Sequence, residues 1–363
     1  MKRNKFNIIR IALFAALPAI VLSGCTKDTA IPPTPPTVSP VTTTGTVALF
    51  AGSNTFGSGN GTGAAATFSY PTGLATDVAG NVYVADQANN QIRKITSAGA
   101  VTTLSGTLLP GSTNATAIGA TAAYNNPSGV AIDAANNVYI ADFLNNQIRK
   151  ITVATGAVTT LAGATASGSV NAIGAAARFN GPAGVAADAT GNIYVADYNN
   201  NQIRKISADG VVTLLAGSTA GNVNGVGAAA KFNGPRSVAV DLTGNVYVAD
   251  ANNNVIRKIA ADGTVTTLAG TGAIGNADGA GTAATFYHPA GVAVDALGNV
   301  YVADTNNNLV RKITAAGVVS SLAGSGYLTL TAPFNAPAGI TVNAAGTMVY
   351  VASALGNTIH TVK

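Results

Sequence analysis

From residue 46 onward, apolar residues come in short runs separated by clusters of glycine, asparagine and aspartate. One unit of this pattern has runs at 289–295, 300–303, 310–313 and 318–322, with a turn sequence after each of the first three. Short, valine-rich runs are typical of β-strands, and Gly and Asn suit turns that need a positive φ. The pattern therefore predicts an all-β chain of short strands joined by tight turns.

The second run of a unit is apolar at every position. Val82 and Val84 fall on one side of the predicted strand, and Tyr83 and Ala85 fall on the other, because successive side chains alternate. A strand with two apolar faces has to be covered on both of them. We therefore expect sheets that pack face to face with neighbouring sheets.

This second run is also the clearest mark of an internal repeat. Its Tyr recurs in steps of 56, 55, 53, 54 and 49 residues, which defines six units. Repeats of this length indicate a propeller, a solenoid or another array. The six residues that mark the units are Tyr83, Tyr139, Tyr194, Tyr247, Tyr301 and Tyr350.

The two ends of the repeat region complement each other. The last unit stops after its third strand, at 358–362, whereas residues 46–52 match the fourth-strand pattern seen at 264–270. If the first segment supplies the missing strand, the units close into a ring, and no polar caps are needed as in an open solenoid. The prediction is a six-bladed β-propeller over 46–363, closed by pairing of the N-terminal strand with the last blade.

The repeated motifs carry a family resemblance. Pro-x-Gly-Val-Ala-Val-Asp, Gly-Asn-Val-Tyr-Val-Ala-Asp and Asn-x-Ile-Arg-Lys-Ile together resemble the NHL repeat, with the last unit departing at Ser353 and in its third strand. The resemblance implies a propeller and a general role in binding. It does not define a ligand, because the family has protein-binding, RNA-binding and enzymatic members.

The N-terminus predicts export and lipid attachment. Basic residues precede an apolar run at 11–22, which is too short to span a bilayer but suits a signal peptide. Leu22-Ser23-Gly24-Cys25 resembles the bacterial lipobox, so we expect residues 1–24 to be a signal peptide and Cys25 to carry the lipid. A buried thiol near an ordinary secretory cleavage site is the alternative. The Pro/Thr-rich remainder of 25–45 is then a tether.

Charge counts argue against a nucleic-acid partner. The net charge of +5 includes four basic residues before residue 25, and the remaining chain has 15 Lys and Arg against 14 Asp. Arg-Lys in five third strands and Asp at the ends of first and second strands account for most of these charges. We interpret them as repeated Asp–Arg pairs and turn caps, with almost no unmatched positive charge to bind phosphates.

The chain has few residues that could bind a metal or a cofactor. The chain has no Glu, and His288 and His360 are its only histidines, so we predict no cofactor and no zinc site. The weak candidate for a cation site is a ring of Asp at the ends of second strands, although hydrogen bonds to turn amides explain each of them separately. These residues are Asp86, Asp142, Asp197, Asp250 and Asp304.

Binding residues are expected where the units differ. The links from second to third strands and from each unit to the next emerge on one face, and the latter are long. Phe143 and Tyr198 stand there where most units have small or polar residues, and Tyr287 and His288 come from a long link. Other units have a small residue between Pro and Gly at the start of the innermost strand, whereas unit four has Arg236 at this position, where it would suit a carboxylate or a phosphate.

These observations predict a lipid-anchored, monomeric propeller in the bacterial cell envelope, at the outer membrane or cell surface, that binds a protein, peptide or glycan on its long-loop face. One alternative is a lyase or lactonase that acts at the central channel, and another is a structural envelope component. His288 within hydrogen-bonding reach of Arg236 or of the Asp ring would favour the enzyme. A shallow apolar face with Phe143 and Tyr198 would favour binding.

Overall fold

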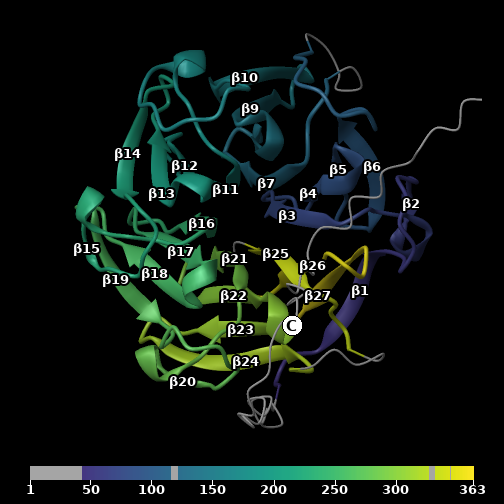
Figure 1. The fold of residues 1–363 in the computed structure, drawn as a ribbon. Helices are drawn as coiled ribbons and strands as arrows, with labels where there is room; N and C mark the ends of the chain where they lie inside the picture. The colour runs from purple at the N-terminus through teal and green to yellow at the C-terminus, as the bar shows by residue number, and fades with distance from the viewer. Residues whose placement is uncertain (1–42, 116–121, 327–331, 344) are drawn as a thin grey trace, which may run out of the picture. The chain divides into compact units, whose positions relative to one another are not determined.

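The computed structural model of the chain describes residues 43–115, 122–326, 332–343 and 345–363. In these residues, six antiparallel sheets surround a central axis (Figure 1). The all-β, six-bladed propeller predicted from the repeat is therefore confirmed. Among the described residues, no helix has both the length and the hydropathy to cross a membrane.

Each blade has four main strands, which follow one another from the axis outward (Figure 1). Blade one contains β3 (Pro71–Thr76), β4 (Val82–Asp86), β5 (Gln91–Ile95) and β6 (Ala100–Ser105); blade two contains β7 (Pro127–Ile132), β8 (Val138–Asp142), β9 (Gln147–Thr152) and β10 (Ala157–Gly163); blade three contains β11 (Pro182–Ala187), β12 (Ile193–Asp197), β13 (Gln202–Ile206) and β14 (Val212–Gly217). Blade four contains β16 (Pro235–Val240), β17 (Val246–Asp250), β18 (Val255–Ile259) and β19 (Thr264–Ala269); blade five contains β21 (Pro289–Val294), β22 (Val300–Asp304), β23 (Leu309–Ile313) and β24 (Val318–Gly324); blade six contains β25 (Pro337–Val342), β26 (Val349–Ser353), β27 (Thr358–Val362) and β1 (Val47–Gly52). The two-residue strands β2 (Gly61–Thr62), β15 (Gly225–Val226) and β20 (Gly279–Ala280) extend blades one, four and five at their outer edges.

Blade six closes the ring with strands from both ends of the sequence. β1 pairs antiparallel with β27, with Val47 opposite Val362 and Gly52 opposite Thr358. Beside this pair, the Thr46 amide donates to the Lys363 carbonyl at 2.9 Å. The predicted closure by the N-terminal strand is confirmed.

The blades pack face to face through the apolar second strands. Tyr83, Val84 and Ala85 are buried, and every core cluster combines residues of two neighbouring blades. One fully buried aromatic ring per blade precedes the innermost strand, as expected for blade packing; these rings belong to Phe68, Tyr124, Phe179, Phe232, Phe286 and Phe334.

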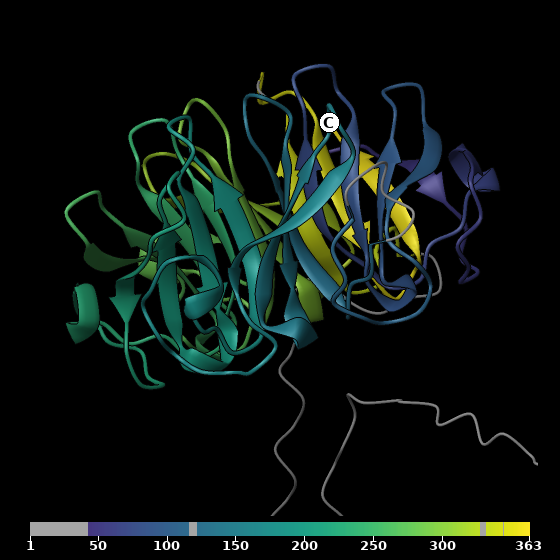
Figure 2. The same cartoon turned by 90° about the horizontal axis from the view of Figure 1, so that it is seen from above.

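The strands run between two faces (Figure 2). We call the end with the hairpins from first to second and from third to fourth strands the turn face, and the opposite end the connection face. Single-turn 3-10 helices on the connection face follow the second strands; they are η2 (Gln87–Asn89), η3 (Phe143–Asn145), η5 (Tyr198–Asn200), η7 (Ala251–Asn253) and η9 (Thr305–Asn307). Four others lie in the links between blades: η1 (Gly63–Ala65), η4 (Gly174–Ala176), η6 (Gly227–Ala229) and η8 (Gly281–Ala283).

An Asn after each second strand links its blade to the next. Asn90 adopts a left-handed conformation with φ of 54°, which Asn tolerates better than most residues, and its side-chain oxygen accepts the Asn126 amide of blade two at 2.8 Å. The same contact recurs at every blade boundary, including Asn357 to Tyr70 across the closure. The predicted asparagine turns therefore also join the blades.

The first strands line the axis. On the connection face, their starts surround a cavity of about 80 Å³, which we call the channel mouth. On the turn face, their ends surround a second cavity of about 200 Å³ with Thr76, Ile132, Ala187, Val240, Val294 and Val342 among its lining residues.

Candidate functional site

Blades one to five each contain a buried ion pair between the Asp at the end of the second strand and the Arg of the third strand. In blade one, Arg93 Nη1 lies 2.8 Å from an Asp86 carboxylate oxygen, and both side chains are fully buried. The same pair joins Arg149 to Asp142, Arg204 to Asp197, Arg257 to Asp250 and Arg311 to Asp304, at 2.9 to 3.1 Å. The predicted Asp–Arg pairing is confirmed.

Each of these carboxylates has further partners inside its own blade. Asp197 also accepts the Asn180 amide and the Asn200 side-chain amide, both at 2.8 Å. Burial raises the pKa of Asp197 to about 6, and these hydrogen bonds and the charge of Arg204 act against the rise. The arginine in turn lies over the buried aromatic ring that recurs in every blade, with its guanidinium carbon 5.3 Å from the Phe179 centroid.

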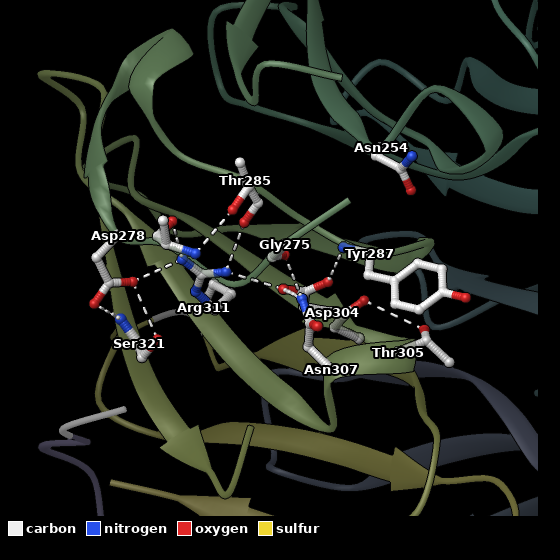
Figure 3. A network of polar contacts seen from close by, with 12 residues as sticks. Asn254, Gly275, Asp278, Thr285, Tyr287, Asp304, Thr305, Asn307, Arg311 and Ser321 are labelled. Atoms are coloured by element: carbon white, nitrogen blue, oxygen red, sulfur yellow. Dashed lines mark hydrogen bonds and ion pairs between the residues drawn. The ribbon is translucent and has the colours of Figure 1, made fainter. Parts of the chain in front are cut away.

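Blade five shows the full network (Figure 3). Arg311 contacts Asp304 at 2.9 Å, a second carboxylate at Asp278 at 2.7 Å, and the Thr285 carbonyl at 3.0 Å. In blades one to four, an Asn oxygen takes the place of Asp278; these residues are Asn60, Asn114, Asn171 and Asn224. The Asp residues suggested as a cation ring are thus each bound within one blade, and the described residues contain no group of three or more His, Cys, Asp or Glu arranged to hold a metal.

The Asp residues at the ends of first strands cap turns on the turn face. Asp77 accepts the Ala79 and Asn81 amides and the Tyr83 hydroxyl. Burial alone would raise the pKa of Asp77, but these hydrogen bonds outweigh burial and lower it. Equivalent caps occur at Asp133, Asp188, Asp241 and Asp295.

At the channel mouth, the blades have different residues at equivalent positions. Its lining includes the residue after each Pro that begins an innermost strand: Thr72, Ser128, Ala183, Arg236, Ala290 and Ala338. Arg236 is partly exposed there, and within the described part of the chain it forms no hydrogen bond or ion pair. The structure thus places the predicted Arg236 at the cavity with its donors unused.

His288 lies beside Arg236 in the ring of blades but is not bonded to it. Its backbone has a φ of 53°, and its amide donates to Asn254 at 2.9 Å. Burial, together with the positive charge of Arg236, lowers the pKa of His288 to about 4. Over the described residues, the imidazole forms no hydrogen bond with Arg236 or with the Asp residues, so the contact that would favour the enzyme is not present. The adjacent Tyr287 is exposed, and its amide donates to Asp304 at 2.8 Å.

Phe143 and Tyr198 form a neighbouring pair of rings on the connection face. Their centroids are 6.3 Å apart and the ring planes are inclined by 57°. A Cβ added to Gly181 would lie 3.1 Å from the Phe143 ring, and one added to Gly234 would lie 3.0 Å from the Tyr198 ring. Each aromatic ring therefore extends over a glycine of the next blade.

These glycines are the signal that sequence reasoning missed. The position before the innermost strand has a positive φ in every blade, and other blades place Tyr70, Asn126, His288 and Ala336 there. Where the preceding blade presents a large ring, the position is Gly; where it presents Ala251 or Ala354, the position is His288 or Tyr70. At these paired positions, each blade boundary thus holds at most one aromatic or imidazole ring. The rings at these positions are Tyr70, Phe143, Tyr198 and His288.

Charge is distributed unevenly between the two faces. On the connection face, the described Asp side chains are bound to arginines, whereas Arg178, Lys231 and Arg236 have no carboxylate partner. Asp209, Asp262 and the five turn caps lie on the turn face. The expectation of almost no unmatched positive charge is therefore wrong for the connection face. The net charge is near neutral only because the unpaired Asp residues lie on the opposite, turn face. Arg178 nevertheless donates to two backbone carbonyls, both at 2.7 Å, so Arg236 has more of its donors free.

Comparisons with known proteins agree with the repeat. The sequence model of the NHL repeat matches residues 68–95, 124–151, 179–206, 232–259 and 286–313. The sixth unit, with Ser353 and a divergent third strand, is not among these matches. The protein SUPPRESSOR OF QUENCHING 1, chloroplastic, of Arabidopsis thaliana is 32% identical over 265 residues, which is 68% of this chain and 25% of that protein. NHL repeat-containing protein 2 of Homo sapiens is 36% identical over 132 residues, or 33% of this chain and 18% of that protein. The chain thus spans a quarter or less of the length of these relatives.

Solved structures share the fold at lower identity. A structural genomics protein of unknown function from Bacteroides thetaiotaomicron has a TM-score of 0.66 and 23% identity, covering 88% of this chain and 76% of that one. An auxiliary nutrient binding protein from the same organism has a TM-score of 0.65 and 16% identity, covering 89% and 77%. A streptogramin B lyase has a TM-score of 0.54 and 15% identity, covering 88% and 97%. Five of the six blades of this propeller thus contain an NHL repeat.

Proposed function

We propose that this protein is a lipid-anchored binding module of the cell envelope that holds a protein, peptide or glycan on its connection face. The observation that carries the proposal is a set of five non-repeating residues of blades two to five on the connection face. Arg236 lines the channel mouth. Phe143 and Tyr198 form a ring pair that reaches the glycine before the Arg236 strand. His288, which follows Tyr287, lies near enough to Arg236 for its charge to act on the imidazole. We call these five residues the rim cluster. Positions in the blade interior repeat, whereas these positions do not, and an asymmetric ligand needs such differences.

The size of the channel mouth favours binding at the surface over enclosure of a substrate. Sites that bury a drug-sized ligand occupy about 300–1,000 Å³. The cavity here has about 80 Å³, enough for several water molecules or a small chemical group. A ligand would therefore insert one group at the mouth and rest on the rim.

The route of the chain supports an outward-facing rim. Gly45 donates to the Leu322 carbonyl at 2.8 Å, and β1 begins at Val47 beside the C-terminal Lys363, so the chain enters the propeller at its turn face. The proposed lipid on Cys25 and most of the proposed tether lie outside the described residues. A tether that enters the turn face leaves the connection face free to meet ligands. The likeness to an auxiliary nutrient binding protein from Bacteroides supports an extracytoplasmic setting for the proposal.

Capture from envelope extracts tests the binding role. The bait is the chain from Thr26 onward, and the variant combines Phe143→Ala, Tyr198→Ala and Arg236→Gln. A matched control replaces Val78, Leu242 and Leu297 by Ser, because these apolar side chains are highly exposed on the turn face. We expect the wild type and the control to retain the same partner or glycan and the rim variant to lose it. Equal capture by all three would contradict the proposal.

The anchor is tested separately. Cells expressing the full chain are labelled with a clickable fatty acid, and Cys25→Ser is the variant. We expect label on the wild type and none on the variant, together with release of the variant from the membrane fraction. Label that persists in Cys25→Ser would contradict lipid attachment at this residue.

A further inference from the structure

Blade four departs from the other blades at two consecutive positions of the channel mouth. It has Arg236 and Ser237 where the others have Thr, Ser or Ala followed by Gly. The glycines are there because blades approach closely: a Cβ on Gly129 would lie 2.5 Å from the Ala183 carbonyl oxygen. Blade four instead adds a hydroxyl next to its guanidinium, and both residues line the cavity.

The unused hydrogen-bond donors of the mouth are concentrated on these two residues. Thr72 donates its hydroxyl to the Ser128 carbonyl at 3.0 Å, and Ser128 donates to the Ala183 carbonyl at 2.7 Å. The Ser237 hydroxyl oxygen accepts the Val292 amide at 3.3 Å, which leaves its own proton to donate. The guanidinium of Arg236 offers five N–H groups with no partner in the described chain.

The charge at the channel mouth suits a ligand with a single negative charge. Arg236 is the cation that lines the cavity, and the neighbouring His288 is neutral at pH 7 because its pKa is about 4. A carboxylate carries a single charge and fits the planar fork of Arg in bidentate fashion. A phosphate monoester carries about −1.5 to −2 at pH 7, which would leave part of its charge uncompensated at this partly buried position.

The surroundings of Arg236 indicate which chemical group lies next to the carboxylate in the ligand. Tyr198 packs over Gly234, two residues before Arg236, and Phe143 continues the apolar surface. Leu144 is exposed on the same single-turn helix as Phe143. A sugar would need a hydrogen-bond partner for each of several hydroxyls, whereas the hydroxyl protons of Thr72 and Ser128 are already donated. An apolar side chain next to a carboxylate fits better.

We propose that Arg236 and Ser237 bind the C-terminal carboxylate of a peptide whose last, apolar side chain lies against Tyr198 and Phe143. This proposal rests on the proposed function and gives its ligand a chemical class: a protein or peptide with a free, accessible C-terminus that ends in an apolar residue.

The test measures binding of a defined probe to the full-length chain in detergent micelles. The probe is dansyl-alanyl-alanyl-phenylalanine with a free carboxylate, followed by fluorescence anisotropy, and its counterpart is the same peptide with a C-terminal amide. Because the amide loses the charge-assisted hydrogen bonds to Arg236, it should bind at least roughly tenfold more weakly than the acid. Arg236→Gln should remove this preference, Ser237→Ala should reduce it, and Arg236→Lys should restore only part of it. Arg178→Gln and Lys231→Gln, on the same face, should leave it unchanged.

Several results would overturn the proposal. One is equal binding of the acid peptide and the amide peptide, and another is an unchanged preference for the acid in Arg236→Gln. A third is that inorganic phosphate displaces the peptide at a lower concentration than acetate does. Binding of galacturonate in place of the peptide would also overturn it in favour of an acidic sugar. Thermal melting of each variant identifies loss of folding. If Arg236→Gln does not fold, Ser237→Ala, which removes only one hydroxyl group, still tests the preference for the acid over the amide. If Arg236→Gln still captures the partner that the triple rim variant loses, this proposal fails and the proposed function stands.

Discussion

The interior of the blades and the channel mouth use the same repeat in opposite ways. In the interior, five blades have the same buried Arg–Asp pair and an aromatic ring under the guanidinium, which is Tyr124 in blade two and Phe in the other four. At the channel mouth, equivalent residues change from blade to blade, from Ala183 to Arg236, and on the connection face beside it they change from Ala251 to Phe143. The difference teaches that recurring charge in this protein maintains the fold, and that charge and aromatic surface for recognition are found among the exceptions.

Blade six sharpens the comparison because it is the exception in the interior. Ser353 replaces the Asp, and His360 lies opposite Val351 where the other blades have Arg. The Ser353 hydroxyl oxygen still accepts a backbone amide, that of Asn335 at 2.8 Å, and His360 meets Phe334 edge-on at 5.6 Å. The closing blade thus keeps the geometry with neutral groups, in line with the small net benefit of many buried ion pairs.

The largest effect is expected from breaking one interior pair. Arg204→Met leaves the Asp197 carboxylate buried without its counter-charge, which costs about 3 to 5 kcal/mol of unfolding free energy. Arg178→Met, which removes only contacts to nearby carbonyls, should cost well under about 1 kcal/mol. Urea denaturation measures both. The double variant Arg204→His with Asp197→Ser imitates blade six and should be more stable than Arg204→Met; equal losses for all three variants would refute the structural role of the pair.

A smaller effect concerns acid and the histidine of blade six. Burial lowers the pKa of His360 from 6.5 to about 4, so the folded protein binds fewer protons than the unfolded chain between these pH values. Stability should therefore fall as the pH drops from 6.5 to 4, by about 1 to 3 kcal/mol from this group after solvent screening. In His360→Asn, the difference in urea midpoint between pH 7 and pH 4.5 should shrink. An unchanged difference would mean that His360 is not buried in this way.

Filling the space under a rim ring should have a still smaller and more local effect. Gly234→Ala places a methyl group 2.5 Å from the Asn252 side-chain amide and 3.0 Å from the Tyr198 ring, at a φ of 58°, whereas Gly244→Ala meets nothing within 4 Å at a φ of 84°. Both substitutions carry backbone strain of about 1–2 kcal/mol, and only the first also displaces neighbouring side chains, the Tyr198 ring among them, at about 1 kcal/mol more. Equal unfolding free energies, with unshifted Tyr198 resonances, would contradict the packing of Tyr198 over Gly234.

The smallest change in stability is expected at the residue with the largest role in binding. Arg236 has no partner in the described chain, so Arg236→Gln should alter the unfolding free energy by no more than about 0.5 kcal/mol. A loss comparable to that of Arg204→Met in the same urea titration would show that Arg236 supports the fold, and the contrast between interior and mouth would disappear.

The fold could be predicted from the sequence because periodic patterns determine it. The recurrence of Tyr-Val-Ala-Asp and the missing last strand were enough to derive six blades and the closure by β1. The Asp–Arg pairs followed from equal numbers of Asp and Arg at fixed repeat positions. Burial on both faces followed from the lack of polar alternation in the second strands.

The site was less predictable because it depends on contacts between blades. Arg236 stood out as a departure within its own unit, but the relation of Phe143 to Gly181 joins residues of two units, and no single unit displays it. The unmatched charge of the connection face was also hidden, since composition gives totals and not positions. Ser237 was passed over because its importance depends on a hydroxyl that the glycines of other blades lack.

An NMR titration of isotope-labelled protein with the free-carboxylate peptide tests the central claim most directly, because it shows where a ligand binds. The prediction is that the side-chain Nε–H resonance of Arg236 and the amides of Ser128 and Ser237 shift, while Thr76 and Thr341 at the opposite cavity do not. Shifts confined to the turn face, or the same shifts in Arg236→Gln, would contradict the assignment of recognition to the exceptions at the channel mouth.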